Sequence, residues 1–184
     1  MEWLTNLEQA KEEAMKLRKP ILLQFELDKC GGCRQLYKTT YPDPEVEKEL
    51  NEWFVLLKLD ILRDKEIRRK LGAYWTPSLY FLDHKENSYY HFNGYLPPED
   101  FRIMLRLGLT ESMMPRGRYD EIIEIVEKDL DEFNNNILAP KLMVQKEMAR
   151  YIKTKDNSKL RSTLKEIQKK YPDSIEAKMY FWDE

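Results

Sequence analysis

Two cysteines separated by two residues constrain this chain more than any other feature. Cys30 and Cys33 are the only cysteines in 184 residues. They directly follow a short apolar run, residues 21–27, that predicts a buried strand, and a helical pattern begins at the second cysteine. Unpaired N–H groups at a helix start stabilise a thiolate, and a thiol one turn along can resolve a mixed disulfide. The pair therefore predicts thiol–disulfide exchange, with Cys30 as the nucleophile and Cys33 as the resolving thiol.

The two thiols could also serve as zinc ligands or as a structural bridge. A zinc site needs about four ligands, and only His84 and His91 remain as further donors of that kind. A structural bridge over so short a loop would constrain the unfolded chain little. Both alternatives stay open but are weaker, and we expect neither a metal nor a cofactor. Gly31 and Gly32 are expected to place no steric demand on the backbone, and Lys29 to favour the thiolate.

Helical and strand patterns alternate along the first 108 residues. This order predicts an α/β sandwich, a mixed sheet flanked by helices whose last two strands form a hairpin. The predicted elements are helix 3–19, strand 21–27, a helix from residue 33 that is interrupted at 41–44 and resumes over 45–51, strand 53–61, helix 64–71, strands 78–82 and 88–92, and helix 98–107.

The remainder of the chain carries no strand signal. Residues 109–117 predict a linker, and residues 118–184 a small all-α region of about four helices. The stretch 169–174 (KKYPDS) gives this region a weak resemblance to tetratricopeptide hairpins. We expect the region either to bind a partner or self-associate, or to cap the sheet.

The composition of the chain argues against nucleic acid and membranes as partners. Charged residues make up 35% of the chain, but the net charge is only −2, so no basic field favours nucleic acid. No apolar stretch reaches the roughly 18 residues that a membrane span needs. The first 20 residues are amphipathic and charged, unlike a targeting segment. We therefore expect no nucleic acid or membrane partner and a cytoplasmic location.

Several segments in order and spacing resemble the thioredoxin family over residues 1–108. The resemblance implies that Pro77 is a cis-proline packed against the disulfide, and that the backbone of Thr76 pairs with an extended client chain. It also implies protein disulfides as clients and a reductase as electron donor. The broken second helix resembles a subgroup that includes the periplasmic domain of the bacterial transmembrane disulfide reductase. The segments that carry the resemblance are 21–25, 30–33, 54–60, 76–79 and Gly94, and 41–46 for the subgroup.

Three positions depart from the family pattern. Gln24 stands where the family has a buried acid, Lys29 where it has tryptophan, and Gly-Gly where it has Gly-Pro between the cysteines. Strand alternation puts Glu26 on the face of Gln24, so Gln24, Glu26 and Lys29 are expected to tune the thiols. The redox direction stays open, and net reduction is the default in a reducing cytosol. Trp75 is expected either to line the substrate surface or to lie in the core.

A different class of function is a binding or scaffold protein with incidental cysteines. In that hypothesis the sandwich docks partners and the helical region selects them. The aromatic residues of the last strand offer a binding face only if they are not packed inside. We expect most of them to pack, and we expect no catalytic role for the histidine among them. These residues are Tyr89, Tyr90, His91, Phe92 and Tyr95.

Overall fold

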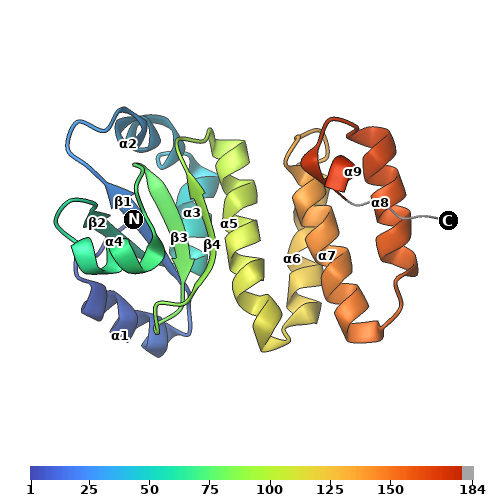
Figure 1. Cartoon of the computed structure of the whole chain (residues 1–184), viewed down its shortest axis with the longest axis horizontal. Helices are drawn as coiled ribbons and strands as arrows, with labels where there is room; N and C mark the ends of the chain where they lie inside the picture. Colours follow the sequence, from blue (N-terminus) through green and yellow to red (C-terminus); the bar gives the residue numbers. More distant parts are fainter. Residues whose placement is uncertain (180–184) are drawn as a thin grey trace. The chain divides into compact units, whose positions relative to one another are not determined.

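The computed structural model describes residues 1–179, which divide into two compact units (Figure 1). The first unit runs from Met1 to Ser112, and the second begins at Met113. The predicted last helix and helical region extend past residue 179, so their final residues lie outside the described part of the chain.

The first unit is a four-stranded sheet with helices on both faces, as the alternating pattern predicts. Strand β1 pairs in parallel with β2 and antiparallel with β3, and β3 forms the predicted hairpin with β4. The strand order across the sheet is β2-β1-β3-β4. The elements are α1 (Leu7–Leu17), β1 (Ile21–Glu26), α2 (Gly31–Gln35), η1 (Leu36–Thr40), α3 (Pro44–Trp53), β2 (Val55–Asp60), α4 (Lys65–Leu71), β3 (Ser78–Leu82), β4 (Ser88–Asn93) and α5 (Pro98–Met113).

Strand β1 is buried on both faces because helices cover each side of the sheet. Leu23 and Phe25 pack into one apolar core together with Ala10 of α1 and Ile67 of α4. Successive side chains of a strand point to opposite faces, so Gln24 points to the other side, beneath the helix that follows the cysteines. This register places a polar side chain directly behind the cysteine pair.

The predicted interruption of the second helix is confirmed. After α2 the chain forms a single π-helical turn, η1, in which the Tyr41 N–H donates to the Leu36 carbonyl at 2.9 Å. The Asp43 carboxylate then accepts from the N–H groups of Glu45 and Val46 at 3.1 Å, and Pro44 opens α3. Caps of this type start a new helix. The π turn directs the Tyr41 side chain inward, toward the sheet.

The segment 109–117, predicted as a linker, is helical in its first part. Helix α5 continues to Met113, and a 3-10 turn, η2 (Met114–Arg116), follows it. The predicted helix ends at residue 107, directly before Gly108, where a Cβ would lie 2.2 Å from the Phe81 ring. The glycine permits a close approach between helix and sheet, so α5 passes through it.

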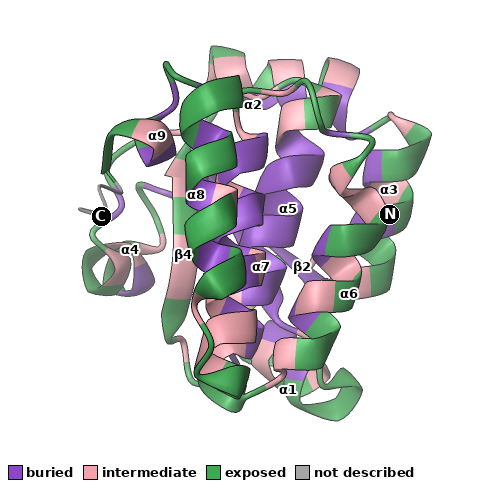
Figure 2. Cartoon of the chain, turned by 90° about the vertical axis from the view of Figure 1, so that its right-hand side faces the viewer, coloured by how far each residue is buried: buried purple, intermediate pink, exposed green. Residues whose placement is uncertain are grey.

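The second unit is helical, as predicted. Figure 2 shows α8 with a buried stripe and an exposed outer face, which is the burial pattern of an amphipathic helix. Leu160, Leu164 and Ile167 form that stripe. The tetratricopeptide resemblance remains a prediction. The helices among the described residues are α6 (Tyr119–Leu130), α7 (Ala139–Thr154), α8 (Ser158–Lys170) and α9 (Ile175–Met179).

Candidate functional site

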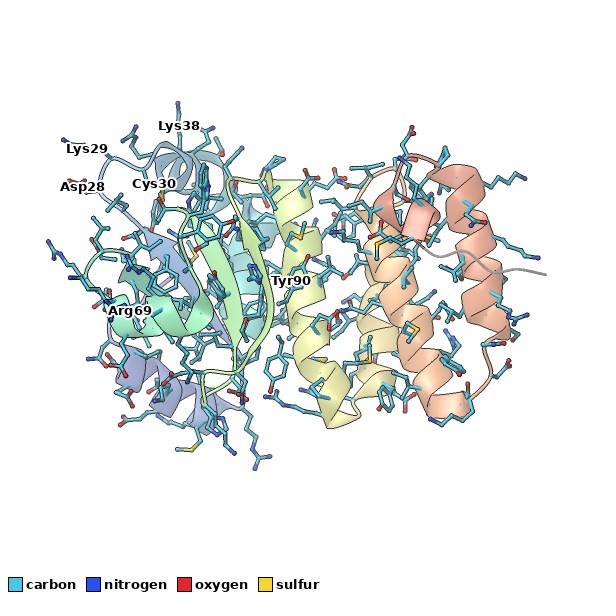
Figure 3. All side chains as sticks on the ribbon, in the orientation of Figure 1. Asp28, Lys29, Cys30, Lys38, Arg69 and Tyr90 are labelled. Carbon is cyan, nitrogen blue, oxygen red and sulfur yellow. A yellow bond between two sulfur atoms is a disulfide. The ribbon has the colours of Figure 1, made fainter. Side chains whose placement is uncertain are left out.

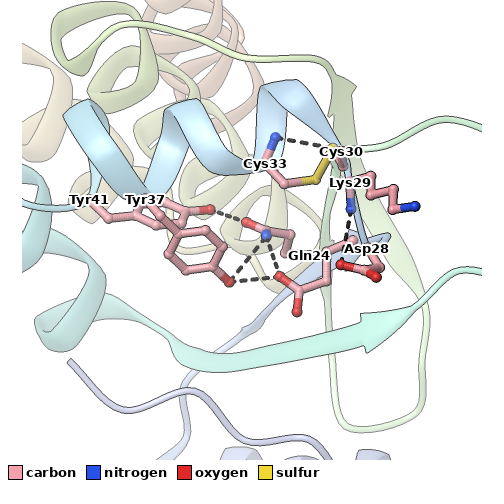
Figure 4. The surroundings of a disulfide bond; sticks show 8 residues. Gln24, Asp28, Lys29, Cys30, Cys33, Tyr37 and Tyr41 are labelled. Atoms are coloured by element: carbon pink, nitrogen blue, oxygen red, sulfur yellow. Dashed lines mark hydrogen bonds between the residues drawn. A yellow bond between two sulfur atoms is a disulfide. The ribbon is translucent and has the colours of Figure 1, made fainter.

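The two cysteines form a disulfide at the start of α2 (Figures 3 and 4). Cys30 is the N-cap residue, and its sulfur accepts a hydrogen bond from the Cys33 N–H at 3.1 Å. Cys30 is partly exposed, whereas Cys33 is only 4% exposed. A sulfur that already accepts from a helix N–H keeps that donor when it becomes a thiolate. The more exposed residue of the pair therefore also carries the sulfur that is better placed to hold negative charge.

The two glycines between the cysteines differ in their surroundings. A Cβ on Gly31 would meet open space, but a Cβ on Gly32 would lie 2.8 Å from Pro77 Cδ and 3.8 Å from the Cβ of Tyr95. The expectation that both glycines are free of steric demands is therefore wrong for Gly32. The cysteine loop packs on Pro77, with Tyr95 beside it, and sequence reasoning missed Tyr95 as a neighbour of the site.

The Thr76–Pro77 peptide bond is cis, as the resemblance implies. Pro77 is buried, Thr76 is partly exposed, and the Pro77 carbonyl accepts from the Gly94 N–H at 2.7 Å. Trp75 is 56% exposed and Tyr74 is 81% exposed. The core placement considered for Trp75 is therefore wrong, and Tyr74 is a second exposed aromatic ring that sequence reasoning did not single out.

A chain of hydrogen bonds lies behind the disulfide (Figure 4). The Tyr41 hydroxyl donates to the side-chain oxygen of Gln24, which is fully buried. The Gln24 Nε2 donates to Glu26 Oε2 at 3.2 Å, and the Tyr37 hydroxyl donates to the same oxygen at 2.8 Å. The predicted neighbourhood of Gln24 and Glu26 is thus a direct contact. Tyr37 lies in the π turn and Tyr41 directly follows it, and the sequence pattern does not reveal this turn.

Both tyrosines of this network are held in the neutral form. Burial raises the pKa of Tyr41 well above its usual value. Burial also raises the pKa of Tyr37, and the hydrogen bond to Glu26 raises it further. A neutral phenol is a hydrogen-bond donor. Tyr37 and Gln24 donate to the Glu26 carboxyl group, and Tyr41 donates to Gln24.

Lys29 sits in a tight turn before the first cysteine. Its φ is +65°, and its N–H donates to the Asp28 carboxylate at 3.1 Å. The Cys30 N–H donates to the Leu27 carbonyl at 3.1 Å, which closes the turn. The Lys29 side chain is exposed and runs away from the disulfide in Figure 4. Its charge therefore acts on the thiols only through solvent, which weakens the influence expected for it.

The aromatic residues of β4 and its C-terminal side pack, as expected. His91 stacks on the Tyr80 ring with a centroid distance of 5.0 Å, and Phe92 meets Phe101 edge-on. The Tyr95 hydroxyl lies 3.1 Å from the hydroxyl of Thr39, just after the cysteine helix.

Two kinds of site are absent from residues 1–179. No group of three or more His, Cys, Asp or Glu side chains there is arranged to hold a metal ion. Within the same residues, no helix has the length and apolar character needed to cross a bilayer.

Comparisons with known proteins agree with this geometry. A family model described as a thioredoxin-like domain matches residues 7–108. Over 91 residues the chain is 31% identical to the thiol:disulfide interchange protein DsbD of Vibrio vulnificus. That alignment covers 46% of this chain but 15% of the relative, so the chain matches a small part of that protein.

Solved structures share the fold of the first unit. A thioredoxin from Thermus thermophilus superimposes with a TM-score of 0.53 and 22% identity, covering 58% of this chain and 85% of that structure. A putative disulphide-isomerase from Bacteroides thetaiotaomicron superimposes with a TM-score of 0.52 and 25% identity, covering 59% and 90%.

Proposed function

Since the chain belongs to the thioredoxin-like domain family through residues 7–108, we propose that it is a thiol–disulfide oxidoreductase that reduces client proteins. The observation that carries the proposal is the placement of the disulfide. Cys30 caps α2 and is a partly exposed residue, whereas Cys33 is buried. A nucleophile must be reachable by the client, whereas a resolving thiol needs to reach only the sulfur of the nucleophile.

The proposed reaction proceeds through two exchanges. The Cys30 thiolate attacks one sulfur of the client disulfide, forms a mixed disulfide and releases the other client sulfur as a thiolate that takes up a proton. Cys33 then loses its proton and attacks the Cys30 sulfur, which releases the second client thiol and leaves the Cys30–Cys33 disulfide. Two electrons have moved to the client, so a dithiol reductase must regenerate the pair.

The client would be held by its backbone. We propose that the main chain of Thr76 pairs with an extended client segment, as the family resemblance implies. Such strand addition gives affinity without demanding a particular sequence. The exposure of Thr76 and Trp75 beside the cysteines supports this placement.

Gln24 and Glu26 are proposed as tuning residues. A neutral amide replaces the buried acid of the family, so no buried charge at Gln24 opposes a thiolate at the pair. The nearest carboxylate of the network belongs to Glu26, one hydrogen bond further away. The direction we propose is reduction in a reducing compartment such as the cytoplasm. The sequence has two cysteines, and both belong to the pair that we propose to be reactive, so no additional structural bridge calls for an oxidising compartment.

The test is a trapping experiment with Cys33→Ser and Cys30→Ser. The first variant should accumulate a mixed disulfide with a client protein, because the resolving thiol is gone. The second should trap nothing and reduce nothing. If Cys30→Ser keeps binding partners and no disulfide is turned over by the unmodified chain, the scaffold hypothesis replaces this one.

A further inference from the structure

An open pocket of about 490 Å³ lies beside the cis-proline loop. Thr76, which precedes Pro77, forms part of its wall, and Tyr74 forms another part. Arg68 and Arg69, in the last turn of α4, also line the pocket. A ligand in this pocket would therefore be adjacent to the backbone that we propose to hold the client.

The charged residues that line the pocket are all positive. Its lining includes two arginines and no acidic residue. Arg68 is anchored, because its guanidinium donates to the Ile61 carbonyl at 3.3 Å. The Arg69 side chain is exposed and makes no hydrogen bond or ion pair within residues 1–179 (labelled in Figure 3). A guanidinium without a partner is well suited to bind a carboxylate through two parallel hydrogen bonds.

The rim of the pocket also offers apolar contact area. Tyr74 is 81% exposed and Leu62 is 56% exposed, and both line the pocket. Large exposed apolar side chains that gather at one place mark surfaces that contact other proteins. Aromatic and arginine side chains are also those that contribute most to binding at such surfaces. The pocket thus combines the features of a peptide-binding site with a positive charge.

We propose that this pocket binds an acidic side chain of the client polypeptide, so that the protein prefers disulfides flanked by Asp or Glu. This inference rests on the proposed function and adds a substrate preference to it. The preference is local, since the chain as a whole carries a net charge of −2 and would repel acidic clients. Arg69 supplies the charge, and Tyr74 with Leu62 covers the aliphatic part of the bound residue.

The experiment uses two fluorogenic disulfide peptides that differ only by Glu or Gln next to the cysteine. The full chain reduces each peptide in the presence of a regenerating dithiol, and the second-order rate constants are compared. Arg69→Gln removes the proposed contact. The matched control is Lys38→Gln, which removes the same charge from an exposed residue of η1 outside the pocket.

The unmodified protein should reduce the Glu peptide about two- to fivefold faster than the Gln peptide, the range that a single exposed ion pair supports. Arg69→Gln should reduce both at the rate of the Gln peptide, and Lys38→Gln should keep the preference. The proposal would be overturned if the unmodified protein reduced the two peptides at equal rates. It would also be overturned if Arg69→Gln and Lys38→Gln lost the preference for the Glu peptide to the same extent. If Arg69→Gln instead slows only the reduction of glutathione disulfide, the pocket binds the carboxylates of a small thiol and the peptide proposal is wrong. If the unmodified protein reduces neither of the two peptides, this result contradicts the proposed function itself.

Discussion

Gly32 lies directly against the ring of Pro77, so closely that a Cβ at Gly32 would come within 2.8 Å of Pro77 Cδ. The helix that carries the cysteines and the loop that we propose to hold the client are therefore in contact at this point. The family has proline between the cysteines where this chain has Gly32. Here a Cβ at Gly32 would require the cysteine loop or Pro77 to shift.

Replacing Gly32 by alanine should destabilise the protein. Its methyl group would force the cysteine loop and Pro77 apart, at a cost of about 1–3 kcal/mol for such overpacking. Gly31→Ala is the matched control and should change the free energy of unfolding little, because a Cβ there meets open space. Urea denaturation of both variants measures the difference. Equal effects of the two substitutions would show that the contact with Pro77 does not matter.

Removing the Tyr41 hydroxyl tests the network behind the disulfide. Tyr41→Phe leaves the buried oxygen of Gln24 without its donor, and an unsatisfied buried acceptor costs about 1–3 kcal/mol. Tyr37→Phe removes a hydroxyl from the partly exposed Glu26, where water can take its place, and should cost less. Thermal unfolding ranks the two variants. The assignment fails if Tyr37→Phe is the more damaging change.

The contact between Gly108 and Phe81 predicts a non-additive pair. Gly108→Ala should destabilise the fold because its Cβ would come within 2.2 Å of the Phe81 ring. In that background, Phe81→Leu should cost much less than it does alone, since the smaller side chain relieves the overlap. A double-mutant cycle of unfolding free energies measures the coupling. Additive effects would contradict the close packing of α5 on β3.

The ion pairs of Glu86 should make the stability of the protein depend on pH. Hydrogen bonds from Lys11 at 2.8 Å and Lys70 at 2.7 Å hold the pKa of Glu86 below the usual value. The contribution of Glu86 to the free energy of unfolding is therefore fully present above the pKa of glutamate in the unfolded chain, about 4.3. This contribution is lost as the pH falls through the lower pKa of Glu86 in the folded protein.

The stability difference between the unmodified protein and Glu86→Gln should accordingly shrink on acidification from neutral pH. Glu52→Gln, at an exposed position of α3, should show a much smaller difference at every pH. Urea titrations at several pH values between neutrality and about pH 3 test this. A difference that grows toward low pH would reverse the predicted sign.

Much of the first unit could be predicted because its signals are local. The apolar run before Cys30, the aliphatic β2 and the hairpin after Pro77 each carry a pattern that fixes their type. The extent of α5 could not be predicted in this way. Gly108 breaks a helix by propensity, but its contact with Phe81 is a tertiary requirement that a sequence window does not contain.

The reactive cysteines, cis-Pro77 and the contact of Gln24 with Glu26 were predictable, but the other neighbours of the site were not. The spacing of Cys30 and Cys33 predicts thiol–disulfide exchange. Tyr37 and Tyr41 lie behind the disulfide because of a π turn, and the hydrophobic pattern of the sequence does not predict such a turn. The pocket at Arg69 likewise requires α4 and the loop before β3 to be brought together in three dimensions.

The reduction potential of the Cys30–Cys33 pair tests the central claim most directly. The protein is equilibrated with glutathione buffers of graded poise, and its free thiols are counted after acid quenching. The account predicts a two-electron transition near about −270 mV, as in thioredoxin-type reductases. A value near about −120 to −180 mV would contradict net reduction and indicate an oxidant or isomerase. A pair that forms no disulfide at any poise would contradict thiol–disulfide exchange altogether.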